Sequence, residues 1–223
     1  MDHYQGLIKS PLFQGISYDD LASLVKCLGC SFKEFIKDEI ICHAGDPVRD
    51  IGIVVNGRVR ILKEDAWGNS NIIAEITEGD MFAEAVVCAG VGILPVTVAT
   101  VQDTLVCFAD FSRILSTCAS ACVFHKHLIR NLIGVFARKN IALAGKMEHI
   151  TKRTTREKLL SYLMEQSKAN GGGSFDIPFD RQGLADFLSV ERSALSAEMS
   201  KLRADGLIVY RKNRFELKRT SLS

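Results

Sequence analysis

A heptad stripe in the middle of the chain does most to limit how it can fold. Between residues 122 and 150, side chains that are apolar with one exception recur at alternating steps of four and three: Ile129, Ile133, Phe136, Asn140, Leu143, Met147 and Ile150. This spacing keeps one seam of an α-helix facing a partner helix. Asn140 is the exception, a polar residue of the kind that fixes the register of such a pair. We expect a long helix over residues 122–150, with the first six of these residues forming a homodimer contact. A helix packed on its own domain would show the same period.

The stretch before this helix has the pattern of a β-rich domain. Short apolar runs alternate with turn signals at Gly45-Asp46, Asn56-Gly57 and Gly79-Asp80, which predicts strands near residues 40–41, 51–55, 59–62, 72–76, 95–101 and 104–108. Asn56-Gly57 favours a hairpin with a type I′ turn, in which both central residues have positive φ. Many short strands with glycine-rich corners favour a double-stranded β-helix, or jelly roll.

The stretch after the long helix has the pattern of a winged helix-turn-helix. Thr154 and Glu157 form a capping-box pattern that starts a helix. Two further helices are expected over residues 180–187 and 190–204, joined by a turn at 188–189, and Gly206 ends the second of them. Two short strands then flank a basic turn at residues 211–213. The fold expected for the whole chain is therefore α+β: a jelly roll, a long helix and a winged helix-turn-helix.

The second of these helices has the composition of a DNA recognition helix. Arg192 lies at its N-terminal end, where a side chain can reach base edges in the major groove, and arginine pairs well with guanine. The charge distribution agrees, because residues 1–150 hold 14 Lys/Arg against 17 Asp/Glu, whereas residues 151–223 hold 14 against 9. The candidate DNA contacts are Arg181, Gln182, Arg192, Ser193, Ser196, Lys212 and Arg214, the last two on a wing along the phosphates.

Two segments make a family resemblance specific. Residues 180–186 (DRQGLAD) and 190–196 (VERSALS) resemble the helix-turn-helix of CRP/FNR family bacterial transcription regulators. The turns at residues 45–46, 56–57 and 79–84 resemble the glycine corners of that family's cyclic-nucleotide-binding-like effector domain. The resemblance implies an effector domain over residues 1–121, a dimerisation helix over 122–150 and a DNA-binding domain over 151–223. It also implies a homodimer that reads near-palindromic operators, and as partners double-stranded DNA, a small-molecule effector and RNA polymerase. An activator is our working expectation.

The resemblance fails at two places that bear on specificity. Ser193 stands where family members often have glutamate, and Ala197 stands where they often have a second arginine. Members that bind cyclic AMP hold its phosphate with an arginine and a serine, where this chain has Leu94, Pro95 and Val96. A buried phosphate without a charged partner costs roughly several kcal/mol, so we do not expect cyclic AMP as the effector. The effector is unknown, and the expected pocket comprises Glu84, Ala85, Pro95, Val96 and Thr97.

Three alternatives stay open at this point. The pair Cys27 and Cys30, together with Cys118 and Cys122, permits an iron–sulfur centre, and His43, His125, His127 and His149 permit haem, either of which would make a gas or redox sensor. A barrel that regulates another protein without DNA is a further possibility. We expect no enzyme, because no phosphate-binding loop, nucleophile elbow or His-Glu-x-x-His motif is present.

Composition sets the expected compartment. No apolar run reaches the ~18 residues of a membrane span, and no export signal stands at the start of the sequence. Seven cysteines, an odd number, agree with reduced thiols in a cytoplasm.

Overall fold

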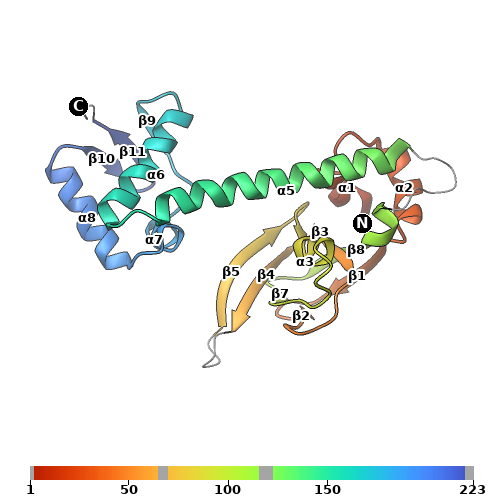
Figure 1. Cartoon of the computed structure of the whole chain (residues 1–223). Helices are drawn as coiled ribbons and strands as arrows, with labels where there is room; N and C mark the ends of the chain where they lie inside the picture. Colours follow the sequence, from red (N-terminus) through yellow and green to blue (C-terminus); the bar gives the residue numbers. More distant parts are fainter. Residues whose placement is uncertain (1–2, 65–69, 116–122, 219–223) are drawn as a thin grey trace. The chain divides into compact units, whose positions relative to one another are not determined.

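The computed structural model describes residues 3–64, 70–115 and 123–218 of the chain (Figure 1). The chain forms two compact units, Met1–Phe136 and Ala137–Ser223. The boundary falls inside the long helix α5 (Val123–Ile150), so each unit includes part of this helix. The expected long helix is confirmed from Val123 onward, while Cys122 lies outside the described residues. The division into three segments at residues 121 and 150 stays a prediction.

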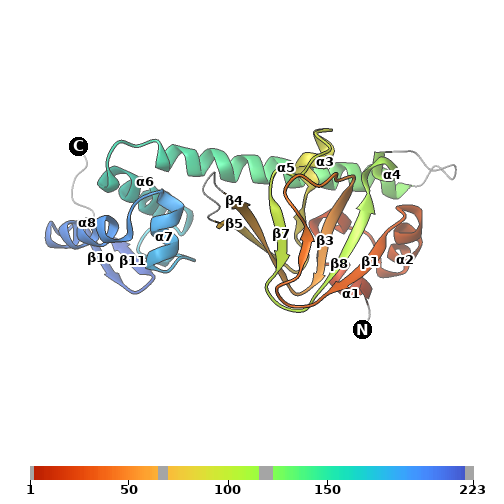
Figure 2. The same cartoon turned by 90° about the horizontal axis from the view of Figure 1, so that it is seen from below.

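The N-terminal unit contains two antiparallel sheets, as expected for a jelly roll (Figure 2). One sheet has the order β1-β8-β3-β6, with β1 Ser31–Phe35, β8 Thr104–Asp110, β3 Asp50–Asn56 and β6 Met81–Phe82. The other has the order β2-β7-β4-β5, with β2 Ile40–Cys42, β7 Thr97–Thr100, β4 Arg58–Glu64 and β5 Ser70–Thr77.

Strand β3 is buried on both faces because it contributes to two separate cores. Val54 packs with Val59 and Val98 in one apolar cluster. Ile51 and Ile53 belong to a second cluster, which also includes residues of the helices α1 (His3–Leu7), α2 (Tyr18–Cys27) and α5 and of the 3₁₀ turn Pro11–Phe13. A strand covered on both faces reads as a continuous apolar run, as it does over residues 51–55.

The hairpin expected at Asn56-Gly57 is wrong. Strand β3 pairs with β8 and β6, and β4 pairs with β5 and β7, so this corner carries the chain from one sheet to the other. Only Gly57 has a positive φ, 99°, whereas a type I′ turn requires one at both residues. A Cβ at Gly57 would lie 2.4 Å from Oγ1 of Thr104, whose hydroxyl also bonds the backbone of Arg58. The glycine permits this close approach.

Other boundaries differ by a few residues, and the strands β1 and β6 and the helix α3 (Glu84–Cys88) were not expected. The strand expected over residues 95–101 begins at Thr97, and the helix α4 is Phe111–Leu115. These three elements carry no strong sequence pattern. Strand β1, for example, is exposed or half-buried along its length, and its pairing with β8 defines it.

The C-terminal unit is the expected winged helix-turn-helix. Its elements are α6 Thr155–Ala169, β9 Ser174–Asp176, α7 Arg181–Leu188, α8 Arg192–Ala204, β10 Ile208–Arg211 and β11 Arg214–Leu217. The three strands form one antiparallel sheet in the order β10-β11-β9. The capping box of Thr154 and Glu157 is confirmed, since each side chain accepts a hydrogen bond from the other residue's backbone N–H. The second helix begins at Arg192, two residues later than expected.

Candidate DNA-binding surface and effector pocket

The turn between α7 and α8 is fixed by contacts at both ends of α7. The carboxylate of Asp180 caps the start of this helix by accepting from the backbone N–H of Gly183 at 2.7 Å. At the other end, Nζ of Lys158 donates to the carbonyl oxygens of Leu188 and Ser189, both at 3.3 Å. A cation at a helix C-terminus interacts favourably with the helix dipole. Ser189 has a φ of 52°, a left-handed conformation more usual for glycine.

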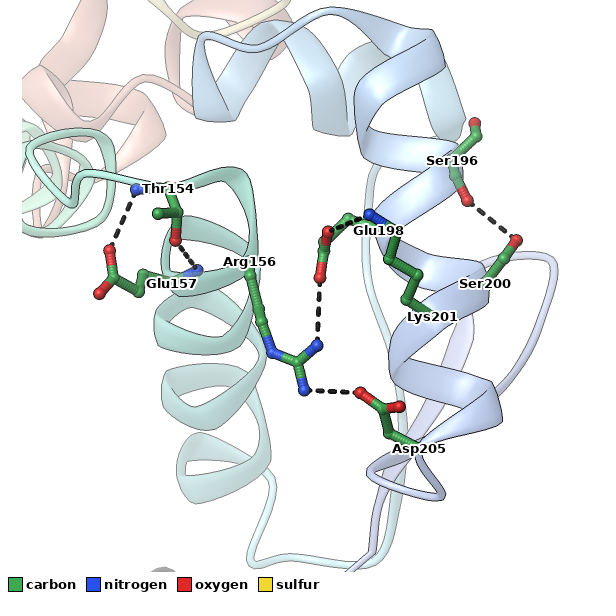
Figure 3. Close-up of polar contacts among 8 residues, drawn as sticks. All are labelled: Thr154, Arg156, Glu157, Ser196, Glu198, Ser200, Lys201 and Asp205. Carbon is green, nitrogen blue, oxygen red and sulfur yellow. Dashed lines mark hydrogen bonds and ion pairs between the residues drawn. The ribbon is translucent and has the colours of Figure 1, made fainter.

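The helix α8 is tied to α6 by one guanidinium group (Figure 3). Arg156 of α6 donates through Nη2 to Oδ2 of Asp205 at 2.7 Å and through Nη1 to Oε1 of Glu198 at 3.3 Å. Both carboxylates come from the α8 side, and Lys201 Nζ lies 3.7 Å from the other oxygen of Glu198. The hydrogen bond with Asp205 raises the pKa of Arg156, a group that is charged at physiological pH in any case. Sequence analysis missed Arg156, because its partners lie far along the chain.

The N-terminal end of α8 presents an exposed polar surface. Arg192, Ser193 and Ala197 are exposed, Ser196 is half-buried, and Leu195 faces the core. The Arg192 side chain forms no hydrogen bond or ion pair with any residue that the structure describes, so its guanidinium is available to a base edge. The arrangement is the one a recognition helix needs: reading residues outward and apolar residues inward.

The two candidates on α7 are occupied by internal contacts. The guanidinium of Arg181 lies 5.1 Å from the centre of the Tyr210 ring and touches the sulfur of Met199. Gln182 is exposed, and its Nε2 donates to Oδ1 of Asp186 at 2.8 Å. A DNA contact by either residue stays a prediction, and it would require these side chains to leave their present partners.

The wing is a tight basic hairpin. Arg211 pairs with Arg214 across strands β10 and β11, which leaves Lys212 and Asn213 as the turn. Lys212 and Arg214 are exposed, and neither forms an ion pair within the described residues 123–218. Charges in this state suit phosphate contacts, which position a protein on DNA without reading its sequence.

The residues expected around the effector lie in α3, in the segment just before β7 and at the first position of β7. Glu84 is 5% exposed and opens α3, after Ala83 with a φ of 64°. Burial, together with the Glu84 charge, raises the pKa of the Cys88 thiol to about 11. Ala85 and Pro95 are exposed and Val96 is half-buried, while Thr97 Oγ1 accepts from the Ala44 N–H at 3.0 Å. Their assignment to one pocket stays a prediction.

Part of the heptad seam on α5 is open to solvent in the single chain. Ile133 is 63%, Leu143 61% and Met147 58% exposed, although all three are large apolar residues. Asn140 is exposed as well, whereas Ile129 is half-buried. Phe136 is half-buried too and packs against the N-terminal core, which sequence analysis missed.

A neighbouring face of α5 packs on the N-terminal unit. Leu128, Leu132 and Val135 are buried in its core. The helix therefore packs on its own domain with one face and leaves a second apolar face uncovered.

The cysteines and histidines do not assemble into a cluster in the part of the chain that the structure describes. No three His, Cys, Asp or Glu side chains there are placed to hold a metal ion. Cys27 and Cys30 are half-buried. A hydrogen bond with Cys30, together with burial, raises the pKa of the Cys107 thiol. Cys118 and Cys122 lie outside the described residues.

His125 is the histidine with the most unusual surroundings. The ring is 5% exposed, and its Nε2 lies 3.0 Å from the carbonyl oxygen of Arg113 and 4.0 Å from Sγ of Cys27. Since a carbonyl only accepts, Nε2 donates to it, and in the neutral ring Nδ1 carries a lone pair. That buried Nδ1 has no hydrogen-bond partner among the described residues. His149, by contrast, is bonded through both nitrogens to Ser161 and Glu165.

Comparison with known proteins agrees with this geometry. Residues 32–121 match the cyclic nucleotide-binding domain, and residues 157–221 match the Crp-like helix-turn-helix domain; together they make up more than half of the chain. The two units thus define a DNA-binding transcription regulator with a cyclic nucleotide-binding-like domain. The chain belongs to the CRP/FNR family. Helix-turn-helix regulators of this family bind DNA and act as dimers, and the family is not one of enzymes.

Solved structures share the fold at low sequence identity. The catabolite activator protein of Thermus thermophilus is 19% identical with a TM-score of 0.50, and the match covers 94% of each chain. The c-di-GMP responsive global regulator CLP of Xanthomonas campestris is 17% identical with a TM-score of 0.58, over 89% of this chain and 100% of that one. A CooA mutant from Carboxydothermus hydrogenoformans is 15% identical with a TM-score of 0.58, over 88% and 86%. No curated protein matches the chain in sequence. Among the described residues, no helix combines the length and apolar character that a membrane span requires.

Proposed function

We propose that this regulator is a homodimer that binds near-palindromic operators and responds to a small-molecule effector other than cyclic AMP. The observation that carries the DNA-reading part is Arg192, exposed and without a partner among the described residues, at the first position of α8. Ser193 follows it directly and Ser196 lies one turn further along α8, and both contact bases or phosphates. Lys212 and Arg214 bind the phosphate backbone of the DNA. Arg181 and Gln182 join them once they leave Tyr210 and Asp186.

The exposed seam of α5 supports the homodimer. Apolar side chains as exposed as Ile133, Leu143 and Met147 are costly in a monomer, since each gains roughly 1.5–3 kcal/mol when it is buried. A second copy offers the same stripe, and a two-fold axis along α5 pairs the two stripes. Ile129, Phe136 and Asn140 then complete the contact. Two reader units related by this axis bind half-sites about 34 Å apart, which makes the operator near-palindromic.

The effector pocket comprises Glu84, Ala85, Pro95, Val96 and Thr97. The absence of an arginine and serine at the positions of Leu94, Pro95 and Val96 leaves a cyclic phosphate without its partners, which disfavours cyclic AMP. An apolar metabolite fits the valine and proline better. Its binding shifts the balance between two packings of the α5 seams, and so changes the spacing of the recognition helices. The regulator works in the cytoplasm and activates transcription through RNA polymerase.

Selection of binding sites from random DNA by the purified full-length protein tests this function. The proposal expects enrichment of one near-palindromic sequence whose half-sites are about one helical turn apart. Enrichment of an asymmetric single site, or of no sequence at all, would contradict it.

His125 favours a second candidate, a metal-based gas or redox sensor. A metal-binding histidine characteristically donates one ring N–H to a carbonyl and leaves the other nitrogen for the metal. In His125, Nε2 bonds the carbonyl oxygen of Arg113, and Nδ1 has no hydrogen-bond partner among the described residues. The described residues fit a single axial ligand, as for haem, better than an iron–sulfur cluster, because no three ligating side chains converge there. An absorption spectrum of protein purified without oxygen tests the candidate. A Soret band that His125→Ala abolishes supports it, and a colourless protein refutes it.

A further inference from the structure

We propose that the C-terminal unit carries an accessory site for small organic ammonium ions with an apolar body. The site is a pocket of about 780 Å³ between the last turn of α5 and one face of α6, lined by residues from 148 to 168. Its volume lies within the roughly 300–1,000 Å³ usual for small-molecule sites. None of its lining residues belongs to the effector pocket or to the DNA-contact set described above.

The pocket has one rigid wall, made by His149. The ring is 3% exposed and lies against the rings of Tyr162 and Phe187. Its Nε2 lies 2.6 Å from Oε2 of Glu165, and its Nδ1 lies 2.8 Å from Oγ of Ser161. Because a carboxylate only accepts, Nε2 donates to Glu165, and in the neutral ring Nδ1 accepts from the Ser161 hydroxyl. These two hydrogen bonds fix the end of α5 against α6 and hold the Glu165 carboxylate in place.

His149 orients the Glu165 carboxylate through one oxygen, and the other oxygen remains available to a ligand. The side chain is 56% exposed, and its second oxygen has no hydrogen bond with a residue that the structure describes. A carboxylate that a neighbour already orients needs no reorganisation when a cation approaches, which makes it a better partner than a freely moving one.

The floor of the pocket is apolar. Leu160 and Met164 lie one turn apart on α6 and both line the pocket. Met164 is 48% exposed, which is unusual for a large apolar side chain beside a cavity. Methionine is flexible and polarisable, so it adapts to apolar groups of different shapes. Burial of an apolar ligand body on this floor gains free energy in proportion to the area covered.

The other charged residues of the pocket determine which sign of charge a ligand should carry. Glu148 is exposed and adds negative charge, whereas Glu157 is committed to the backbone of Thr154 at 3.0 Å. Lys152 and Lys168 also line the pocket, but both residues are exposed, and their ammonium groups have no partner among the described residues. Long flexible side chains of this kind extend into water, so the fixed carboxylate dominates the field inside. A cation with an apolar body satisfies both the carboxylate and the floor.

Methionine-methyl NMR on the full-length protein tests this site directly, with 2-phenylethylammonium as the probe. The Met164 methyl signal, assigned with Met164→Leu, is expected to shift and saturate on titration. The matched anion 3-phenylpropionate has the same apolar body and is expected to leave this signal in place. An unmoved Met164 signal, or equal binding of the anion, overturns the proposal.

Two variants separate the role of Glu165 from a general loss of charge. Glu165→Gln still accepts from His149 but lacks the negative charge, and it is expected to weaken the probe's Kd by at least about tenfold. Glu216→Gln removes the same charge from β11, outside the pocket, and is expected to leave Kd within about twofold. Equal Kd values for the two variants overturn the assignment of Glu165. The titration contains no DNA, so its failure would leave the DNA-binding function untouched.

Discussion

Nη2 of Arg156 lies 2.7 Å from Oδ2 of Asp205, and this contact joins the first turn of α6 to the residue that ends the recognition helix. The same guanidinium reaches Glu198 in the middle of α8, so one side chain fixes both the position and the tilt of the helix. A planar fork with several donors can do this, whereas the single ammonium group of lysine cannot.

We therefore expect Arg156→Lys to lower both the melting temperature of the protein and its affinity for the selected operator. Lys168→Arg makes the reverse exchange on the same helix at a site without a partner among the described residues, and it should change neither quantity. Calorimetry and fluorescence anisotropy measure the two effects. Equal behaviour of the two variants would show that the Arg156 clamp does not position α8.

Lys212 at the wing tip should bind the phosphate backbone, and such binding is blind to base sequence. Lys212→Ala is expected to weaken binding to the operator and to unrelated DNA by the same factor. It should also reduce the slope of log K against log [salt] by about one unit for each phosphate that the variant no longer neutralises. Lys26→Ala removes the same charge from the N-terminal unit and serves as the control. A change in base preference, with the salt slope unaltered, would argue against binding to phosphate.

Charged side chains introduced into the uncovered seam of α5 should convert the dimer into a monomer. Ile133→Glu combined with Leu143→Glu places like charges on the facing stripes and should halve the mass measured by sedimentation. Both residues are exposed in the single chain, so the fold should survive, which circular dichroism can check. Phe136 is a poorer target because it also packs on the N-terminal core. The control, Ile36→Glu with Ile73→Glu, introduces the same charges at two exposed residues outside α5. If this control variant also lost the dimer, the assignment of the seam as the dimer contact would be wrong.

Tyr162 makes the stability of the C-terminal unit depend on pH in the alkaline range. Burial, with a smaller effect of the Glu165 charge, raises the pKa of Tyr162 to about 12, whereas an unfolded tyrosine ionises near 10. The native state therefore keeps the proton while the unfolded state releases it. The stabilisation is complete below about pH 10 and is lost as the pH rises toward 12.

The comparison of wild type with Tyr162→Phe isolates this effect. Relative to the variant, the wild type should lose about 1.4 kcal/mol of unfolding free energy by about pH 11. Denaturant titrations at a series of alkaline pH values measure the difference. Parallel curves for the two proteins would mean that the phenol does not titrate differently in the two states.

Sequence patterns predicted the elements whose signals are local. The long helix follows from its heptad period, and α6 follows from a capping box that the structure confirms. The failures have long-range causes. Asn56-Gly57 has the composition of a hairpin turn, but Thr104, distant in sequence, occupies the space beside Gly57, and the flanking strands join different sheets.

The candidate site shows the same division. Arg192 was placed at the outer end of a recognition helix from local pattern alone, and the structure leaves it exposed. Arg181 looks equally free in the sequence, yet it packs on Tyr210, which only the position of β10 could reveal. Arg156 went unnoticed, and His149 was named only as a possible haem ligand, because each acts through partners on another helix. No motif marks such contacts.

The most direct test of the whole account is operator binding by Arg192→Ala, compared with Lys212→Ala on the selected operator and on versions altered one base pair at a time. If Arg192 reads a base, its loss should cost about 1–3 kcal/mol per contact and abolish discrimination at one base pair in each half-site. Lys212→Ala should preserve that discrimination. Unchanged affinity and unchanged base preference in Arg192→Ala would contradict the assignment of α8 as the helix that reads DNA.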